Sequence, residues 1–128
     1  MPLPNFQTLM RPTLELHADG QDQARAALRD ALAARFELTE EERAEMLPSG
    51  NQRRFDNRLA WTVAHLDQAL LLSRPRRGVT RITERGLQVL RDHPTRLDMA
   101  VLEAFPEYRR FRGNEGKSPG SGDRDIWS

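Results

Sequence analysis

The sequence predicts a mainly α-helical domain that contains a small β-hairpin. Apolar side chains recur at spacings of three and four over most of the first 105 residues, which is the period of an amphipathic helix. A stretch that starts at Val79 instead alternates β-branched and polar side chains, as a strand does. Pro75 and Gly78 come shortly before it and supply the turn of a hairpin.

The first half of the chain is expected to hold three helices. Residues 4–18 have helical spacing, with Pro12 as a kink or as a first-turn proline. One apolar stripe predicts a second helix over residues 23–36. Thr39 followed by Glu42 is typical of a capping box, so a short third helix begins there and ends before a turn-rich loop.

The second half is expected to hold the longest helix and the hairpin. An apolar stripe nearly five turns long predicts a helix over residues 52–72, with Ser49 or Asn51 as its cap. The hairpin surrounds residues 74–78, and the next helix runs from a Thr83 cap to about His93. A last helix over residues 97–105 is expected to stop at Pro106.

This order of elements is the order of a winged helix-turn-helix. In that fold one helix enters the major groove of DNA and a hairpin, the wing, touches the flanking backbone. We therefore expect residues 1–112 to form one winged-helix domain. Residues 113–128 are rich in Gly and Ser and predict a flexible tail or an interdomain linker.

The net charge of +1 conceals an uneven distribution. Residues 1–50 carry a charge of −4, residues 51–96 a charge of +6, and residues 97–128 a charge of −1. A cationic block of this kind usually faces phosphate or an acidic protein. Because 19 of the 20 basic residues are Arg, their abundance says little, and only their placement points to a partner.

The long helix and the hairpin are expected to bring these arginines onto one surface that binds double-stranded DNA. Arg can fork onto phosphate or guanine, and Asn suits adenine. The alternative interpretations are structural. The helix arginines could form a solvated face, Asn51 could cap the helix, Trp61 could pack inside the domain, and the hairpin arginines could keep the hairpin edge soluble. We expect the joint replacement of Arg54 and Arg58 by Ala to remove most binding. The candidate DNA-binding residues are Asn51, Gln52, Arg53, Arg54, Asn57, Arg58 and Trp61 on the helix side, and Arg74, Arg76, Arg77 and Arg81 on the hairpin.

Catalytic and metal sites are not expected. The chain has no Cys, so it has no disulfide, no thiol nucleophile and no thiolate metal site. Its three His residues lie on different predicted elements, and no phosphate-binding loop or catalytic triad is evident. The motif Glu115-Gly116-Lys117 is similar to part of a nuclease site but falls in the predicted tail. Neither a membrane span nor a secretory signal is found, which predicts a cytoplasmic protein without cofactor.

The segments ALAARFELTEEERAEMLPSGNQRRFDNRLAW, SRPRRGVTRITERGLQVL and DMAVLEAFPEYRRFR, with PNFQTLM near the start, carry a family resemblance. Over about residues 2–112 the chain resembles the N-terminal domain of Mrr-type restriction endonucleases. The resemblance implies a winged helix that recognises DNA, joined by a linker to a nuclease domain that restricts methylated DNA. It also implies that Asn51, Arg53, Arg54, Asn57, Arg58, Arg76 and Arg77 face the DNA.

Because the nuclease domain is missing from this sequence, we expect the chain to bind DNA without cutting it. For a methylated base, Trp61 with Ala60 or Thr62 could supply a small apolar pocket. The alternatives are a transcription regulator with one operator, or an interaction module that forms a homodimer. In that module, the last helix would pair two chains through Leu97, Val101, Leu102 and Phe105.

Overall fold

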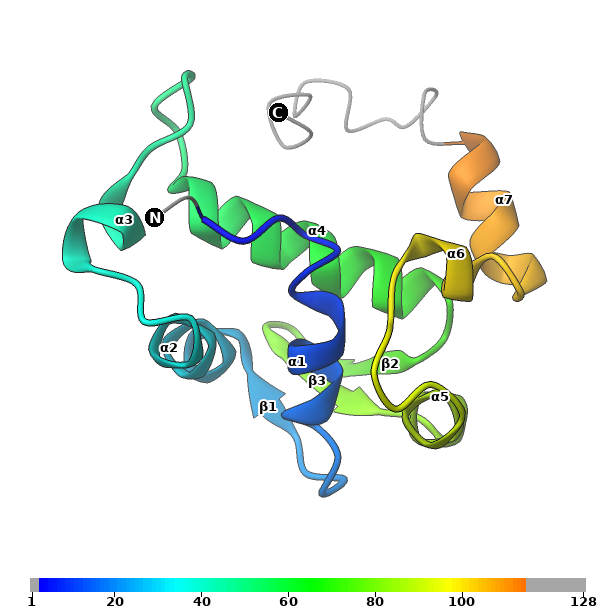
Figure 1. The fold of residues 1–128 in the computed structure, drawn as a ribbon. Helices are drawn as coiled ribbons and strands as arrows, with labels where there is room; N and C mark the ends of the chain where they lie inside the picture. The colour runs from blue at the N-terminus through cyan, green and yellow to red at the C-terminus, as the bar shows by residue number, and fades with distance from the viewer. Residues whose placement is uncertain (1–2, 115–128) are drawn as a thin grey trace.

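A computed structural model describes residues 3–114 of the chain (Figure 1). The predicted tail and the motif at residues 115–117 lie outside these residues, except for the first two residues of the tail. The elements in chain order are α1 (Met10–Glu15), β1 (Gln23–Ala24), α2 (Arg25–Arg35), α3 (Glu40–Ala44), α4 (Arg54–Gln68), β2 (Leu72–Arg76), β3 (Val79–Ile82), α5 (Glu84–Asp92), α6 (Met99–Leu102) and α7 (Pro106–Asn114).

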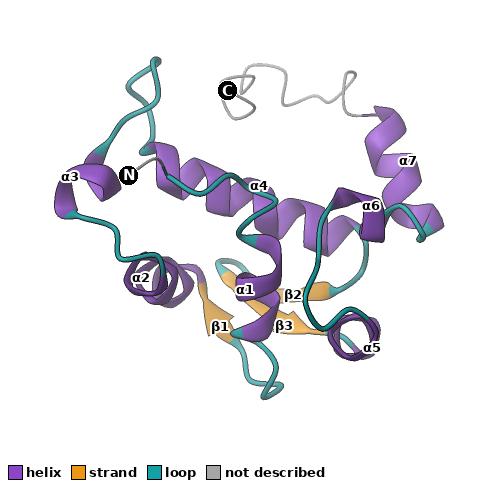
Figure 2. Cartoon of the chain, viewed as in Figure 1, coloured by secondary structure: helices purple, strands orange, loops and turns teal. Residues whose placement is uncertain are grey.

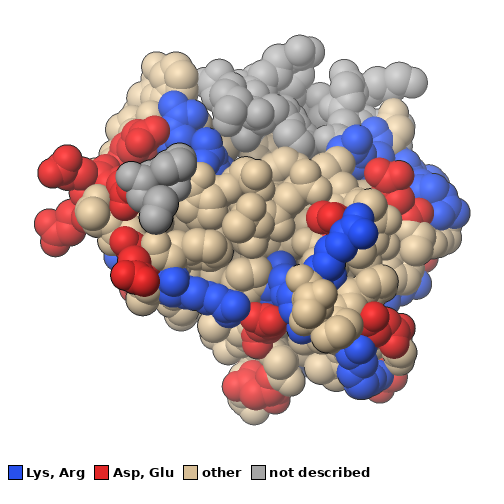
Figure 3. Space-filling model, viewed as in Figure 1, with Lys and Arg blue, Asp and Glu red and all other residues tan. Residues whose placement is uncertain are grey.

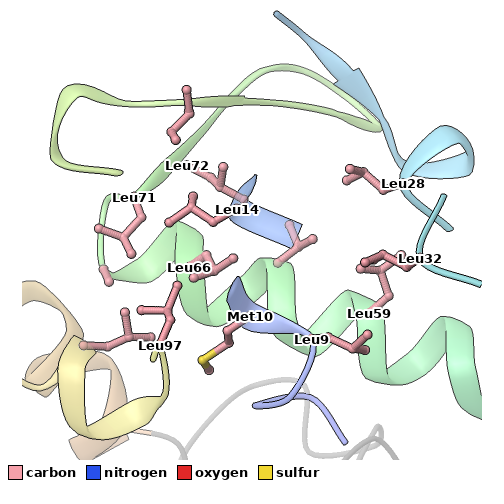
Figure 4. Close-up of a cluster of buried hydrophobic side chains, with 14 of the residues drawn as sticks. Leu9, Met10, Leu14, Leu28, Leu32, Leu59, Leu66, Leu71, Leu72 and Leu97 are labelled. Carbon is pink, nitrogen blue, oxygen red and sulfur yellow. The ribbon is translucent and has the colours of Figure 1, made fainter. Parts of the chain in front are cut away.

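Helix α4 lies at the centre, and the other elements surround it (Figures 1 and 2). Its predicted apolar stripe is buried, since Phe55, Leu59, Val63 and Leu66 are all inaccessible to solvent. Figure 4 shows side chains of α1, α2 and the segment after α4 gathered around this stripe. Burial of the stripe against several elements at once fixes how α4 is oriented in the domain.

The sheet is antiparallel and has three strands in the order β1-β3-β2. The hairpin of β2 and β3 was predicted, and it turns at Gly78, whose φ is 75°. Strand β1 was not predicted, because its two residues are too short for a periodic signal. A helix, a strand, three helices and then a β-hairpin that completes a three-stranded sheet make a mainly α winged helix, so the predicted fold class is confirmed.

Two of the predicted helix starts are confirmed by their caps. The Thr39 hydroxyl accepts from the Glu42 backbone N–H at 3.0 Å, and a Glu42 carboxylate oxygen accepts from the Thr39 N–H at 2.8 Å. The Thr83 hydroxyl caps α5 by accepting from the N–H of Gly86 at 3.0 Å. The predicted cap of α4 at Ser49 or Asn51 is wrong, because Arg53 precedes the helix without a side-chain cap.

The ends of the helices differ from the predictions. Helix α4 stops at Gln68, four residues early, because Leu70 turns left-handed with a φ of 64°. The N–H groups of Leu70 and Leu71 then bond the backbone oxygens of Asp67 and Leu66, both at 2.9 Å, which is a Schellman ending. Its hydrogen bonds satisfy carbonyls that the end of the helix would otherwise leave without a partner.

The last predicted helix is also different. Only residues 99–102 of it are helical, as α6, and Pro106 begins the additional helix α7 instead of ending one. Proline at the first position of a helix loses no hydrogen bond. The apolar side chains that were expected to pair two chains belong to the core of the domain itself: Leu97 and Leu102 are buried, and Val101 and Phe105 pack against the core.

Candidate nucleic-acid interface

Asn57 was predicted to face DNA but is fully buried in α4. Its Nδ2 donates a hydrogen bond to Oε1 of Gln52, 3.1 Å away. Gln52 belongs to the loop before α4, so this loop folds back against the first turns of the helix. The expectation that Asn57 lies on an exposed face is wrong, and the side chain instead holds the loop in place.

Arg58 is half-buried and bound to the N-terminal segment. Its Nη1 donates to the backbone oxygens of Leu3 at 2.9 Å and of Pro4 at 3.2 Å. Burial lowers the pKa of Arg58, and the charge of Arg54 lowers it further. The N-terminal segment therefore crosses α4 (Figure 1), and the predicted solvent-facing position of Arg58 is wrong.

The predicted pocket for a methyl group is not formed as expected. Thr62 is fully buried, and its hydroxyl donates to the backbone oxygen of Phe6 at 2.7 Å. Trp61 is half-buried, with its ring centre 5.8 Å from that of His65. Thr62 thus cannot contact a ligand, whereas Ala60 and Trp61 keep part of their surface accessible.

The last turns of α4 are covered by α7. His65 is fully buried, and its Nδ1 shares a 2.7 Å hydrogen bond with the hydroxyl of Tyr108. The rings of Phe6 and Phe111 pack against the imidazole, at 4.8 and 5.1 Å between centres. Burial lowers the pKa of His65 to about 4, with a smaller contribution from Arg112, so the ring is neutral at pH 7.

Arginines from α2 and β2 lie along one side of α4. The spacing of Asp56, Ala60, Ala64 and Asp67 places these four half-buried residues on that side. Arg29 of α2 lies with its Nε 3.2 Å from Oδ1 of Asp56, and Arg74 of β2 lies with its Nε 3.3 Å from Oδ2 of Asp67. Burial raises the pKa of Asp67, while the charge of Arg74 acts in the opposite direction.

Arg25 completes this group and was missed by sequence reasoning. It is the first residue of α2, and its backbone N–H donates to the backbone oxygen of Gly78 at 2.9 Å, which places it beside the hairpin turn. Burial lowers the pKa of its guanidinium, and the charges of Arg74 and Arg29 lower it further. Among residues 3–114, no carboxylate forms an ion pair with Arg25.

The hairpin adds further arginines, as predicted. Asp22 accepts a hydrogen bond from Nε of Arg81 at 2.6 Å and lies 3.8 Å from Nη1 of Arg76. The hydrogen bond from Arg81 lowers the pKa of Asp22. Arg77 is exposed at the turn, and no described carboxylate forms an ion pair with it. We call Arg25, Arg29, Arg74, Arg76 and Arg77 together the arginine surface.

The arginines at the start of α4 are not part of the arginine surface. Nε of Arg54 donates to Oε2 of Glu45 at 2.8 Å, and Arg53 is exposed. On the face shown in Figure 3, basic and acidic side chains are interspersed, with acidic groups near α3 and also elsewhere on this face. The long helix and the hairpin were predicted to bring their arginines onto one surface. In the structure, Arg25 of α2 lies near Arg74 of the hairpin instead.

Neither a metal centre nor a membrane helix is found in the described part of the chain. No group of three His, Asp or Glu residues between 3 and 114 is arranged to hold a metal ion. His17 instead bonds the hydroxyl of Thr80 at 2.7 Å and the backbone oxygen of Thr13 at 2.8 Å, which joins α1 to β3. Within the same residues, no helix combines the length and the apolar character that a bilayer span requires.

A helical core with a three-stranded sheet, whose hairpin and second helix carry the arginine surface, defines a winged-helix domain. The model of the Mrr N-terminal domain family matches residues 6–92, more than half of the chain, and the protein belongs to this family. Membership associates the chain with Mrr-type restriction systems, and no nuclease domain was matched. Searches of curated proteins and of solved structures found no match.

Proposed function

We propose that this chain is a duplex-DNA-binding module of an Mrr-type restriction system, and that the arginine surface holds the sugar-phosphate backbone. The observation that supports this most is the position of Arg25. A half-buried guanidinium that pairs with no carboxylate among residues 3–114, beside two further arginines, is electrostatically unfavourable in the free protein. A phosphate bound there would neutralise the repulsion and accept bidentate hydrogen bonds.

The neighbouring ion pairs support the same proposal. Asp56 and Asp67 hold Arg29 and Arg74 at the two ends of the open side of α4, roughly 16 Å apart along the helix axis. Long side chains fixed in this way lose less conformational entropy when they bind a phosphate. The backbone bond from Arg25 to Gly78 joins this region to the exposed arginines of the hairpin.

The test is the salt dependence of binding to a 30-base-pair duplex, measured by fluorescence anisotropy. Five arginines that each displace one counterion give a slope of about −4.5 in log affinity against log salt. Arg25→Ala is expected to weaken binding and to make the slope shallower by about 0.9. Arg91→Ala, which removes an exposed arginine of α5 that is outside the arginine surface, is the matched control and should leave both values unchanged.

A slope near zero, or equal effects of the two variants, would contradict the proposal. The first result would favour an interaction module. The second would mean that net charge, and not this surface, attracts DNA.

We also propose that the module distinguishes methylated from unmethylated DNA. Ala60 and Trp61 are the two residues of the predicted methyl pocket that keep part of their surface accessible on α4. Affinity should be higher for a methylated duplex than for its unmethylated copy. Equal affinity for the two would remove this finer proposal, and a single tight operator that is independent of methylation would favour a transcription regulator.

The module is proposed to bind without cutting. The purified chain should leave a supercoiled plasmid intact in the presence of Mg²⁺, on gels that resolve nicked and linear forms. Cleavage that requires Mg²⁺ and persists through repeated purification would contradict this part of the proposal.

A further inference from the structure

The outer face of α4 offers few side chains to read bases, although this helix corresponds to the reading helix of a helix-turn-helix protein. Gln68, its last residue, is the one residue of α4 that is exposed. The polar side chains predicted to read bases are engaged inside the domain, as shown above for Asn57 and Arg58. If the domain reads sequence, another element next to the arginine surface must supply the contacts.

The loop of residues 46–53 is that element. It projects from the domain between α3 and α4 (Figure 1). Met46 and Arg53 form an antiparallel bridge at its base, and the N–H of Leu47 donates to the backbone oxygen of Gln52 at 2.9 Å. Gly50, with a φ of 72°, turns the chain at the tip, and its N–H donates to the backbone oxygen of Leu47 at 2.8 Å.

The base of the loop is anchored in three ways. The side chain of Leu47 is buried, with 4% of its surface exposed. The Asn57 side chain donates a hydrogen bond to Gln52. Arg54, the residue after the loop, forms an ion pair with Glu45, the residue before it. A hairpin fixed at its base presents its tip in one position, so little ordering is required when it enters a groove.

The exposed side chains of the loop, from its base to its tip, have the chemistry that base edges require. Met46, Asn51 and Arg53 are exposed, and no carboxylate occurs between Glu45 and Asp56. Among described residues, Arg53 forms no ion pair. Asn and Arg make the bidentate contacts that identify adenine and guanine, and an apolar side chain such as Met46 suits the C5 methyl group of a pyrimidine.

The loop also adjoins the arginine surface. Arg53 comes three residues before Asp56, which holds Arg29, so the two positions are separated by about 4.5 Å along the helix axis. A backbone phosphate on Arg29 would therefore bring the adjoining groove of the duplex next to the loop.

We infer that Asn51 and Arg53, on the anchored loop of residues 46–53, determine the base sequence that this domain selects, in place of the outer face of α4. This inference rests on the proposed binding of duplex DNA. It assigns phosphate contacts to the arginine surface and base contacts to the loop, a division common in DNA-binding proteins.

The experiment is selection by the full chain from a duplex library with 20 random base pairs, prepared with cytosine or with 5-methylcytosine. The wild type should enrich a short motif. Asn51→Ala and Arg53→Ala should each lose about tenfold in the ratio of affinities for the motif and a scrambled duplex, but bind the scrambled duplex within about threefold of the wild type. Arg53→Lys keeps the charge without the planar fork and should lose specificity as Arg53→Ala does.

Gln68→Ala is the matched control on α4, and thermal unfolding checks that every variant is folded. An unchanged motif in both alanine variants of the loop would overturn the inference, as would a motif that changes with Gln68→Ala instead. Binding of the library without any enriched motif would also overturn it while the proposed DNA-binding function stands. Failure to bind the library at all would overturn both.

Discussion

The guanidinium of Arg25 lies in an environment that favours a neutral side chain, although arginine stays charged. Its position follows from the pairing of β1 with β3, which brings the start of α2 to the hairpin turn. Arg58 is also half-buried, but it donates two hydrogen bonds to the backbone. We therefore expect Arg58 to stabilise the free protein and Arg25 not to do so.

Arg58→Ala should lower the free energy of unfolding by about 2 kcal/mol, because charged hydrogen bonds to two carbonyls are lost. Arg25→Ala should leave this free energy unchanged or raise it, since it removes a repelled charge. Urea denaturation measures both. A loss of more than about 1 kcal/mol in Arg25→Ala would show that Arg25 has a structural role.

The buried His65 makes stability depend on pH. Its pKa is about 4 in the folded protein, so the unfolded chain, with an ordinary pKa of 6.5, binds a proton that the folded chain cannot. Stability should therefore be complete above pH 6.5 and fall toward pH 4, by about 3 kcal/mol from this residue. His65→Asn keeps a polar group near Tyr108 but does not titrate, so its urea midpoint should change less over this range. Equal pH profiles for the variant and the wild type would contradict the assignment.

Residue types and spacings predicted the hairpin arginines but not the burial of Asn57. Arg74, Arg76 and Arg77 lie next to the turn-forming residues Pro75 and Gly78, and a hairpin turn is nearly always exposed. Asn57 lies opposite the apolar stripe of α4, where periodicity predicts solvent. The loop before the helix covers it, and no local pattern shows that a loop will fold back.

At the scale of the elements, helix starts were more predictable than helix ends. Thr39 and Thr83 carry a chemical signal, because a side-chain oxygen must reach a free N–H. Helix α4 ends at Gln68 because Leu70 is left-handed, and leucine rarely adopts that conformation, so the sequence does not predict this end. Strand β1 forms because it pairs with β3, which is far from it in sequence, so the pairing is a tertiary effect.

The packing of α5 against the hairpin depends on Gly86. A Cβ atom there would approach Cγ1 of Ile82 to 2.6 Å and would meet the backbone oxygen of Leu71 more closely still. Gly86→Ala should therefore lower the free energy of unfolding by about 1–3 kcal/mol, measured by urea denaturation. Gly113→Ala in α7 is the control, because its Cβ meets nothing within 4 Å. Equal stability of the two variants would mean that α5 can move away from the sheet without cost.

At the scale of the whole molecule, the distribution of charge along the sequence was a partial guide. The cationic block of residues 51–96 supplies Arg74, Arg76 and Arg77, but Arg25 and Arg29 come from the block with a net charge of −4. Many acidic side chains of that block lie on and around α3, away from the hairpin turn (Figure 3). Summing charge by segment hid this separation, because α2 and α3 are neighbours in sequence and face different surroundings.

The proposed assignment of phosphate contacts to the arginine surface and of base contacts to the loop also depends on the whole fold. The fold class could be predicted from the order of the elements, since a hairpin after a long helix is typical of a winged helix. The covering of α4 by the N-terminal segment, the loop and α7 could not, because each contact joins residues far apart in sequence. For this reason the proposed binding surface lies on the neighbours of the helix.

The most direct test is an NMR titration of the full chain with a 15-base-pair duplex, which follows backbone amides and arginine side chains. The largest shifts should occur at Arg25, Arg29, residues 74–78 and residues 46–53. Amides of α5 and α7 should change little. Shifts concentrated on α5 or α7, with none at Arg25 and the hairpin turn, would contradict the proposed interface.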